Sequence, residues 1–448
     1  MRRHQPRREP RGRGRARRGG EQRVRLRWSQ YVPRPAKAGR MRRVLVTGLG
    51  IVSSIGNNKD TVLRSLRENR SGIEFVPEMK DLGFRCHVGG RVKDLDVAWI
   101  GRRTLLSMSN VARFAAAAAS EAVQDAKLLP DALKSPRAAV VVGTCFGGVN
   151  EIAKAERVLQ ETRNPLRVGG ASLVRGMHST AAANLAAWLG VQGRVYSLCS
   201  SFATGADAIG HAYEMIGRGT ADVCLCGGAD ESSMRQAWGC LDNWGGMPGS
   251  RNDEPEKACR PYDQDREGPV LSEGAGILLL ESRDHALQRG AHPYAEIVGY
   301  GSSNDGFDMF NPSGEGLTEC IRQAMAAGHE RGVRRIDYIN AHGTGTKVHD
   351  PLEVRVIREL FGTPSPLISS TKGLAGHSLG ATGAHEAIFT LLMLRHGFVA
   401  PTLNLERIAP DCEGVSHVQS LREDPLEAVM SFNAGLGGAN ACLIFRKP

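Results

Sequence analysis

Two histidines and a lysine lie in glycine-rich stretches of the second half of the chain. His342 lies in NAHGTGT, Lys372 in STKG and His377 in GHSLG. Histidine side chains can move protons or donate hydrogen bonds to a developing oxyanion, and a lysine ammonium stabilises nearby negative charge. Taken one at a time, each of these residues is more typical of a structural role than of a chemical one.

Short apolar runs alternate with longer amphipathic stretches from residue 41 onward. We expect strands at the apolar runs 43–48, 138–143, 222–228, 276–282, 295–301, 338–342 and 441–445. We expect helices at 109–127, 203–217, 316–331, 352–360 and 382–396. Several strand candidates are continuous β-branched and aliphatic runs, which is typical of strands covered on both faces. The alternation predicts a layered α/β architecture with largely parallel strands.

The order of these elements recurs on both sides of a turn-rich junction near residues 290–293. We therefore divide the body of the chain into two halves, 41–290 and 291–448. The repeat concerns the order of elements and not the identity of residues.

The net charge of +11 comes from residues 1–40 and not from the body of the chain. This tail holds 14 arginines and Lys37 against Glu9 and Glu21, a net charge of +13, which leaves −2 for the other 408 residues. Its near lack of apolar residues predicts disorder. It is interpreted as a nucleic-acid-binding arm or targeting peptide, as a flexible extension, or as a segment upstream of the true start site. We favour the last, because Met41 opens a strand-like MRRVLVTGLG, and we expect no nucleic-acid partner.

The ten cysteines are scattered and form no paired CxxC motifs, so the sequence predicts neither a metal site nor a disulfide framework. Cys224 and Cys226 stand two apart in a strand-like stretch, and we expect both to be buried. The sequence shows neither the apolar segment of a signal peptide nor an uninterrupted run of about 18 apolar residues. We therefore expect a cytoplasmic protein without a membrane partner.

From Met41 to the C-terminus the sequence resembles the β-ketoacyl-[acyl carrier protein] synthases, in particular their type I elongating branch. The resemblance rests on VTGLGIVSSIGNN, RSGIEF, AEIVGYG, PSGEG, AHGTGT, TKGLAGHSLGATGAHEA and LLMLRHGF. It implies a thiolase-like five-layer αβαβα fold with two pseudo-repeated halves, and an obligate dimer. It also implies that substrate arrives on the phosphopantetheine arm of acyl carrier protein and that no other cofactor is bound.

In that family a cysteine thiolate takes the acyl chain from its carrier, and a decarboxylated malonyl group then attacks the thioester. Such chemistry requires a thiolate at a helix N-terminus and donors around the oxyanion. By resemblance, His342, His377 and Lys372 are the catalytic residues, and their joint presence argues against three separate structural roles. Thr344 and Thr346 match the threonines that bind the pantetheine arm. The charge partners implied for this site are Asp350, Glu353 and Glu386.

The nucleophile of the family has no match in this chain. The family elbow reads SSACAT or close to it, whereas residues 196–205 read YSLCSSFATG. The flanking residues place Phe202 at the nucleophile position. A shift of three residues would bring Cys199 there only by lengthening the following helix by almost a turn, so we expect Cys199 in the preceding strand, facing the core.

A second departure from the family lies near the C-terminus. The family has NSFGFGGTN, in which phenylalanine gates the acyl chain, whereas residues 432–440 read FNAGLGGAN. Leu436 takes the gate position, Ala434 replaces the other aromatic residue, and Gly437 and Gly438 retain the close backbone approach. Loss of nucleophile and gate together suggests a protein that no longer carries an acyl-enzyme.

Several functions remain open at this point. The chain is a non-condensing partner of a cysteine-bearing ketosynthase, like the chain-length factors of polyketide assembly, or a malonyl-carrier decarboxylase, or a carrier-protein-binding scaffold, or a condensing enzyme with an unrecognised nucleophile. The retained histidines and lysine favour the first two over a scaffold. Phe202 has no amide that could imitate a malonyl carboxylate, and this weakens the decarboxylase hypothesis. We therefore expect a partner in fatty acid or polyketide assembly, as a homodimer or a heterodimer.

The tail of residues 1–40 is predicted to be dispensable for folding. A chain shortened to begin at Met41 should melt at the same temperature as the full chain, because a segment that buries no apolar surface adds no stability. Circular dichroism melts of the two chains measure this. A loss of several degrees would show that the tail packs on the body.

Overall fold

Strands and helices alternate along the chain, as the sequence predicts. A computed structural model describes residues 41–233 and 235–448, so the prediction for the tail at 1–40 lies outside the described residues. The strands are β1 (Val44–Ser53), β2 (Ile73–Phe75), β3 (Val88–Gly90), β4 (Ala138–Gly143), β5 (Arg194–Tyr196), β6 (Val223–Asp230), β7 (Gly274–Ser282), β8 (Ala295–Asn304), β9 (Tyr338–Asn340), β10 (Leu367–Ser369), β11 (Phe398–Val399), β12 (Ser416–His417), β13 (Arg422–Glu423), β14 (Ala428–Ala434) and β15 (Ala439–Arg446). The helices are α1 (Lys59–Glu68), α2 (Pro77–Asp81), α3 (Arg102–Leu105), α4 (Asn110–Asp125), α5 (Pro130–Leu133), α6 (Val149–Thr162), α7 (Ser172–Gly176), α8 (Thr180–Leu189), α9 (Thr204–Gly217), α10 (Arg235–Asn243), α11 (Arg283–Gln288), α12 (Glu315–Glu330), α13 (His349–Phe361), α14 (Lys372–Ala375) and α15 (Thr382–His396).

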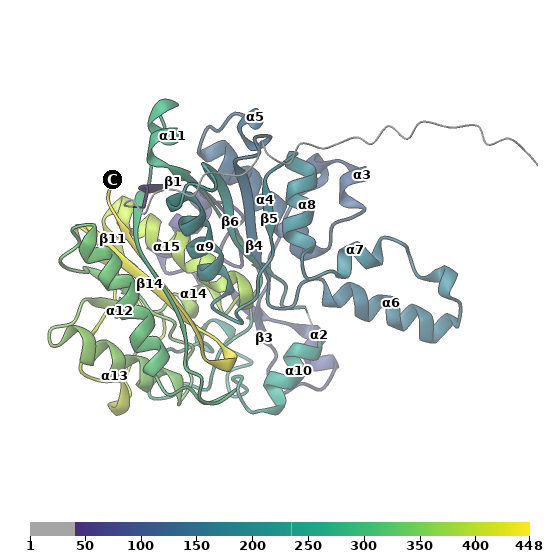
Figure 1. The fold of residues 1–448 in the computed structure, drawn as a ribbon. Helices are drawn as coiled ribbons and strands as arrows, with labels where there is room; N and C mark the ends of the chain where they lie inside the picture. The colour runs from purple at the N-terminus through teal and green to yellow at the C-terminus, as the bar shows by residue number, and fades with distance from the viewer. Residues whose placement is uncertain (1–40, 234) are drawn as a thin grey trace, which may run out of the picture. The chain divides into compact units, whose positions relative to one another are not determined.

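Eleven strands of the described residues form one mixed sheet, in the order β12-β10-β9-β14-β15-β8-β1-β7-β6-β4-β5 (Figure 1). Of its ten strand pairs five are parallel and five antiparallel, so the expectation of largely parallel strands is wrong. A continuous apolar run indicates that a strand is buried on both faces, but it does not indicate whether the strand runs parallel or antiparallel to its neighbours. The strands β1 and β7, for example, are antiparallel although every residue of both is buried.

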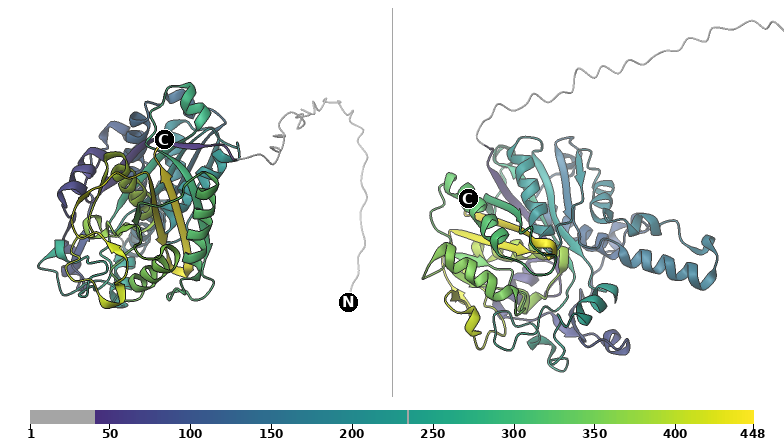
Figure 2. Two further views of the ribbon diagram at one scale, coloured as in Figure 1. Left: turned by 90° about the vertical axis from the view of Figure 1, so that its left-hand side faces the viewer. Right: turned by 60° about the horizontal axis from the view of Figure 1, so that its bottom comes forward.

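Two helices, α9 and α15, form the middle layer of the fold. The helix α9 packs against β4 and β6, whereas α15 packs against β7 on one side and β14 on the other. The outer layers are α4 with α8, which cover β1 and β4, and α12, which covers β8 and β15 (Figures 1 and 2). The two halves of the sheet, joined where β1 pairs with β8, lie on either side of α9 and α15. The resulting order of helix, sheet, helix, sheet and helix is the expected αβαβα arrangement. Strands from 291–448 are contiguous in the sheet, while the division at residue 290 stays a prediction.

The helix α15 is buried on every side from Thr382 to Leu394. Its sequence, TGAHEAIFTLLMLRH, has no polar face, which is typical of a helix surrounded by protein. Burial removes water from its acidic side chain, Glu386, so this carboxylate needs partners inside the protein. No helix within residues 41–233 and 235–448 is long and apolar enough to cross a membrane.

Strand direction decides which residues of the second half can meet. The strands β9, β10 and β14 run parallel to one another. Their C-terminal ends therefore emerge at the same edge of the sheet. His342 follows β9, Lys372 begins α14 just after β10, and Asn433 lies near the end of β14.

The two predictions for cysteines have different outcomes. Cys224 and Cys226 are fully buried in β6, as predicted. Cys199 is exposed and lies beyond β5, which ends at Tyr196, so the expectation that it faces the core from a strand is wrong. The physical reason is that β5 is the last strand of the sheet and all of its residues are exposed, so no core lies against it.

Candidate active site

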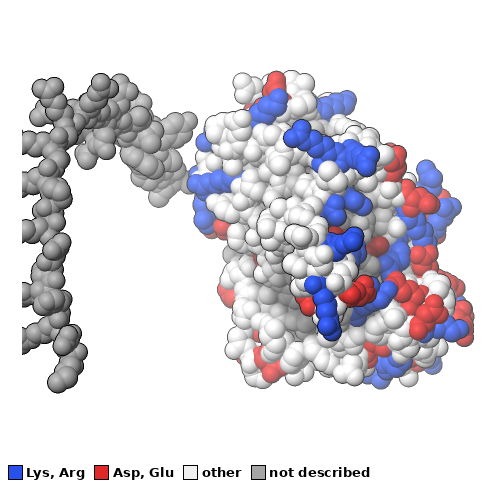
Figure 3. Space-filling model, turned by 90° about the vertical axis from the view of Figure 1, so that its right-hand side faces the viewer, with Lys and Arg blue, Asp and Glu red and all other residues white. Residues whose placement is uncertain are grey.

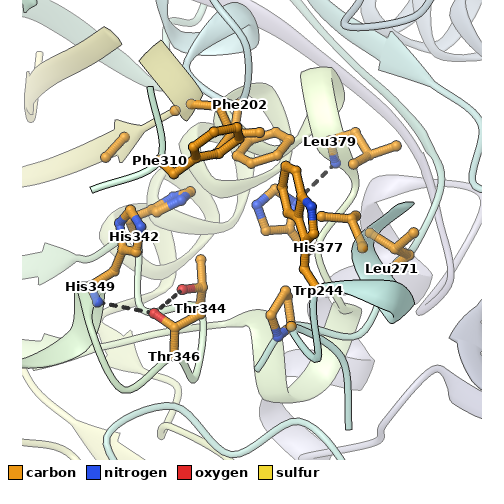
Figure 4. Close-up of a pocket in the computed structure, with 16 residues that line it drawn as sticks. Phe202, Trp244, Leu271, Phe310, His342, Thr344, Thr346, His349, His377 and Leu379 are labelled. Carbon is orange, nitrogen blue, oxygen red and sulfur yellow. Dashed lines mark hydrogen bonds between the residues drawn. The ribbon is translucent and has the colours of Figure 1, made fainter. Parts of the chain in front are cut away.

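A cavity of about 460 Å³ opens where these strand ends meet the start of α9. Phe202 and Leu436 contribute to its apolar lining, and His342 and His377 contribute polar groups. In the view of Figure 4, the two histidines lie on either side below Phe202. A concave, mostly apolar pocket with a few converging polar groups is the expected form of an active or binding site.

The side chain of His342 is oriented by a buried ion pair. Lys372 is 1% exposed, and its Nζ donates to Glu386 Oε1 at 2.5 Å and to the backbone carbonyl of His342. Asn433 Nδ2 donates to the other oxygen of Glu386 at 2.6 Å. Lys372 Nζ and Asn433 Nδ2 each lie 3.4 Å from Nδ1 of His342. Because both neighbours are donors, Nδ1 accepts, and the imidazole proton lies on Nε2.

His377 carries its proton on the same nitrogen. Its Nδ1 accepts the backbone N–H of Leu379 at 3.1 Å, so Nε2 is again the protonated atom. Leu379 has φ +53°, a left-handed conformation that a leucine rarely adopts. The His377 side chain is buried, and its Nε2 has no hydrogen-bond partner among the described residues. A buried donor without a partner is costly, so this N–H marks a place where a ligand oxygen can bind.

Both imidazoles are neutral at physiological pH. Burial lowers the pKa of His342 and that of His377 well below the usual value of 6.5, and the nearby Lys372 ammonium adds to the effect. The two rings are perpendicular, with their centroids 5.5 Å apart. Two neutral N–H donors in one cavity can hold a carbonyl oxygen and stabilise negative charge that develops on it.

Phe202 lies at the turn that leads into α9. Ser201, the residue before it, has φ +54°, and the Thr204 hydroxyl closes the turn by accepting the backbone N–H of Ser200 at 2.9 Å. The phenyl ring lies edge-on to His377, with the ring centroids 4.6 Å apart. The elbow therefore presents its side chain to the histidines, and a strained backbone of this kind is typical of functional sites.

Asp350 and Glu353 hold the turn that carries the two threonines. Asp350 accepts the backbone N–H groups of residues 345 and 346 at 3.0 and 3.2 Å, and Glu353 accepts that of residue 343 at 2.8 Å. Burial raises the pKa of both carboxyls. The hydroxyls of Thr344 and Thr346 lie 3.2 Å apart, and both residues line the cavity. The two acidic residues thus position the turn by hydrogen bonds to its backbone.

A glycine-rich loop after β14 closes the cavity beside the elbow. Leu436 donates its backbone N–H to the Ser201 hydroxyl at 3.1 Å. A Cβ on Gly435 would lie 2.9 Å from the backbone nitrogen of residue 202, so the loop reaches the elbow only because Gly435 has no side chain. Gly437 and Gly438 supply the φ angles of +80° and +79° that the turn requires.

Known proteins match the sequence over the same elements. Residues 41–286 match "Beta-ketoacyl synthase, N-terminal domain", and residues 294–406 match "Beta-ketoacyl synthase, C-terminal domain". The chain belongs to the beta-ketoacyl synthase family. One relative, 3-oxoacyl-[acyl-carrier-protein] synthase 1 of Escherichia coli strain K12, is 44% identical over 410 residues, which are 91% of this chain and 99% of that protein.

Solved structures of ketosynthases have the same fold as this chain. The ishigamide ketosynthase/chain length factor is 33% identical, with a TM-score of 0.85 over 91% of this chain and 100% of the other. A ketosynthase in complex with its type II PKS acyl-carrier protein is 28% identical, with a TM-score of 0.83 over the same shares. The fold is therefore the thiolase-like α/β fold of the ketosynthases. The chain is a β-ketoacyl-[acyl carrier protein] synthase-like protein of fatty acid or polyketide assembly.

The structure brings His342, His377 and Lys372 into one site with Phe202, although their roles stay predictions. It also adds residues that sequence reasoning missed. Asn433 could have been found as the one amide in the mostly apolar strand β14. For Leu379, Trp244 and Phe310, which also line the cavity, the sequence holds no comparable signal.

The buried histidines should make the fold sensitive to acid between pH 7.5 and 5.5. Burial holds the pKa of His377 below 6.5, so the unfolded chain takes up a proton that the folded chain refuses, and stability falls as the pH falls below 6.5. Each such histidine lowers the free energy of unfolding by about 1.4 kcal/mol for every pH unit below 6.5. Urea unfolding at both pH values should show a smaller acid loss for His377→Gln than for the parent chain. His292→Gln, at an exposed histidine, is the matched control. Equal acid loss in parent and His377→Gln would contradict the assignment of a neutral His377.

Proposed function

We propose that this chain is a non-condensing partner of an active, cysteine-bearing ketosynthase, similar to a chain-length factor. The observation that carries the proposal is the Phe202 side chain at the elbow. It faces His377 with the ring centroids 4.6 Å apart and offers no atom that could form a thioester. The resemblance to the family assigns the nucleophilic cysteine to this position.

Other nucleophiles are poorly placed for condensation. Among the described residues that line the cavity there is no cysteine and no serine. Cys145 donates its thiol to the carbonyl of Ser201 at 2.8 Å, and burial raises its pKa. A hydrogen bond with Cys145 lowers the pKa of the Cys199 thiol to about 5, but Cys199 is exposed and does not line the cavity. The thiols of this region therefore lack access to the two histidines.

A partner chain would complete the edge of the sheet. The strand β5 is the last strand of the sheet, and its residues, including the apolar Val195 and Tyr196, are exposed. An exposed, partly apolar edge strand is a template for pairing with another chain. The face on which α6, α7 and α8 lie has a broad area with few charged side chains (Figure 3). Both features support association with a ketosynthase through β5 and its neighbours. Acyl carrier protein is the proposed third component of the complex.

Malonyl-carrier decarboxylation is the second candidate, because one observation favours it. The unpartnered Nε2–H of His377, with that of His342, could hold the enolate oxygen left after loss of CO₂. This activity needs no acyl-enzyme. It does need room for the malonyl group beside Phe202, whose phenyl ring fills space next to His377.

Co-expression should give a mixed dimer. A cysteine-bearing ketosynthase produced together with this chain should co-purify with one copy of each, because pairing through β5 buries an edge in both. Native mass spectrometry measures the composition. A variant with Val195→Lys and Tyr196→Lys, which places like charges at the edge, should lose the complex. Recovery of only homodimers with every ketosynthase tried would count against the partner model.

The isolated chain should take up no acyl group from acyl carrier protein. Phe202→Cys should regain acylation, because α9 still directs its positive N-terminal end at residue 202 and would stabilise a thiolate there. Phe202→Ala creates space without a thiol and is the matched control, expected to stay unacylated. Intact-protein mass spectrometry after incubation with acyl-carrier measures all three chains.

Two results would separate the candidates. A covalent acyl adduct on the unmutated chain, at Cys199 or elsewhere, would reject the non-condensing partner and support a condensing enzyme. Release of CO₂ from malonyl-carrier by the unmutated chain, abolished by His377→Ala, would instead support the decarboxylase.

A further inference from the structure

Two cysteines lie near the elbow, outside the cavity that contains the histidines. Cys145 follows β4 and Cys199 follows β5, and these two strands pair in parallel (Figure 1). The backbone N–H of Thr144 donates to the carbonyl of Leu198 at 3.3 Å, so the pairing continues past both strand ends. Neighbouring strands lie about 4.8 Å apart, and a disulfide spans about 4.4–6.8 Å between Cα atoms. The two cysteines therefore lie on neighbouring segments that a disulfide can bridge.

A histidine joins the same cluster. Cys199 Sγ donates to the carbonyl of Cys145 at 3.7 Å, and Nε2 of His178 lies 3.3 Å from the same oxygen. The carbonyl of His178 accepts the hydroxyls of Thr144 and Ser197, each at 3.3 Å. These two bonds tie the loop before α8 to the ends of β4 and β5. Three separate segments thus hold two thiols and one imidazole together.

The two thiols differ in exposure and in acidity. Cys199 is exposed, whereas Cys145 is partly buried. A hydrogen bond with the Cys145 thiol is the main cause that lowers the pKa of Cys199 to about 5, and the backbone of Ser201 and the side chain of His178 add to it. Burial raises the pKa of Cys145 well above its usual value. At neutral pH the pair is therefore an accessible thiolate beside a protonated thiol.

We propose that Cys199 and Cys145 form a site of oxidation by hydrogen peroxide, at which the two thiols close to a disulfide. The sulfur of Cys199 attacks one peroxide oxygen and breaks the O–O bond, and the other oxygen leaves as hydroxide, which is protonated to water. The sulfur of Cys145 then attacks the Cys199 sulfenic acid and breaks its S–O bond, and the hydroxyl group leaves as water with the Cys145 proton. The two sulfurs lose two electrons in total, and the peroxide gains them.

Oxidation at this site would change a contact of the elbow. In the reduced chain the Cys145 thiol donates to the carbonyl of Ser201 at 2.8 Å, and Ser201 has the left-handed φ of +54° directly before Phe202. A sulfur that is bonded to Cys199 has no proton to donate, so the disulfide removes this hydrogen bond. The site follows the exposed strand β5 and is open in the isolated chain. The inference goes beyond the proposed function and does not require it.

Peroxide treatment of the full, reduced chain at neutral pH tests the site. Remaining thiols are blocked with N-ethylmaleimide, and the tryptic peptides are mapped by mass spectrometry without reduction. The unmutated chain should give a pair of peptides joined through Cys145 and Cys199, which separates on treatment with dithiothreitol. Cys145→Ala should leave Cys199 as a sulfenic acid that dimedone traps, because the second thiol is missing. Cys240→Ser, which removes another exposed cysteine, is the matched control and should form the same disulfide as the unmutated chain.

Alkylation by iodoacetamide tests the thiolate without an oxidant. For a free thiol with a pKa of about 8.5, the rate falls about 50-fold between pH 8.5 and pH 6.5, because the thiolate is the reacting form. The rate at Cys199 in the unmutated chain should fall less than about 2-fold over this range. A small cysteine-containing peptide in the same sample supplies the reference. In Cys145→Ala the Cys199 rate should fall more steeply, because the hydrogen bond that stabilises the thiolate is lost.

Three results would each overturn the proposal. They are the absence of the joined peptides after peroxide treatment, a disulfide that links Cys199 to a cysteine other than Cys145, and a fall in the Cys199 alkylation rate as steep as that of the reference peptide. The alkylation of the unmutated chain needs no substitution, so it tests the proposal even where a variant fails to fold. Neither experiment contains a partner or a carrier protein, so the oxidation site and the partner model can fail independently.

Discussion

The ion pair between Lys372 and Glu386 is the interaction on which the site depends. Both side chains are almost fully buried, and their charges meet at 2.5 Å between two strand ends and the central helix α15. Burial raises the pKa of the Glu386 carboxyl, an effect that Lys372 and Asn433 offset in part. Removing one member of such a pair leaves an uncompensated buried charge, which costs about 3–5 kcal/mol. The pair therefore joins α15 to α14, which begins at Lys372, and through Asn433 to β14.

The same ion pair prepares the histidines for binding an oxygen. Lys372 and Asn433 direct donors at Nδ1 of His342, and the backbone of Leu379 does so at His377. Each imidazole is left with its proton on Nε2, and the low pKa of each keeps the ring neutral. A charged imidazolium would also donate, but burial beside an ammonium makes that form costly. The site is thus preorganised as a neutral pair of donors.

The reaction that this pair of donors can support depends on the side chain at residue 202 of the elbow. A thiol at residue 202 would combine with the donors and the N-terminus of α9 to carry out acyl transfer. A phenyl ring leaves the donors, the cavity and the threonines 344 and 346 that line it in place, without a bond-forming atom. Under the proposed function, a chain with this site binds and positions an acyl group without condensing it.

The sequence alone determined the layered α/β fold and its main elements. The segments 138–143 and 382–396 coincide with β4 and α15, because continuous apolar runs of strand or helix length are strong local signals. Motifs also identified the elbow residue and both histidines. Local sequence did not reveal strand direction, which arises from pairing between distant segments, or the short edge strand that leaves Cys199 exposed.

The tertiary structure decided how those residues act together. The tautomers of His342 and His377 follow from Asn433 and Leu379, and the ring contact of Trp244 and Phe310 joins two loops that are far apart in the sequence. No periodicity or motif encodes such contacts, because hydrogen-bond direction and ring packing depend on where separate elements come together in space. Residue type set the chemistry that is available, and the packing of strand ends against α15 and α9 set which atoms face one another.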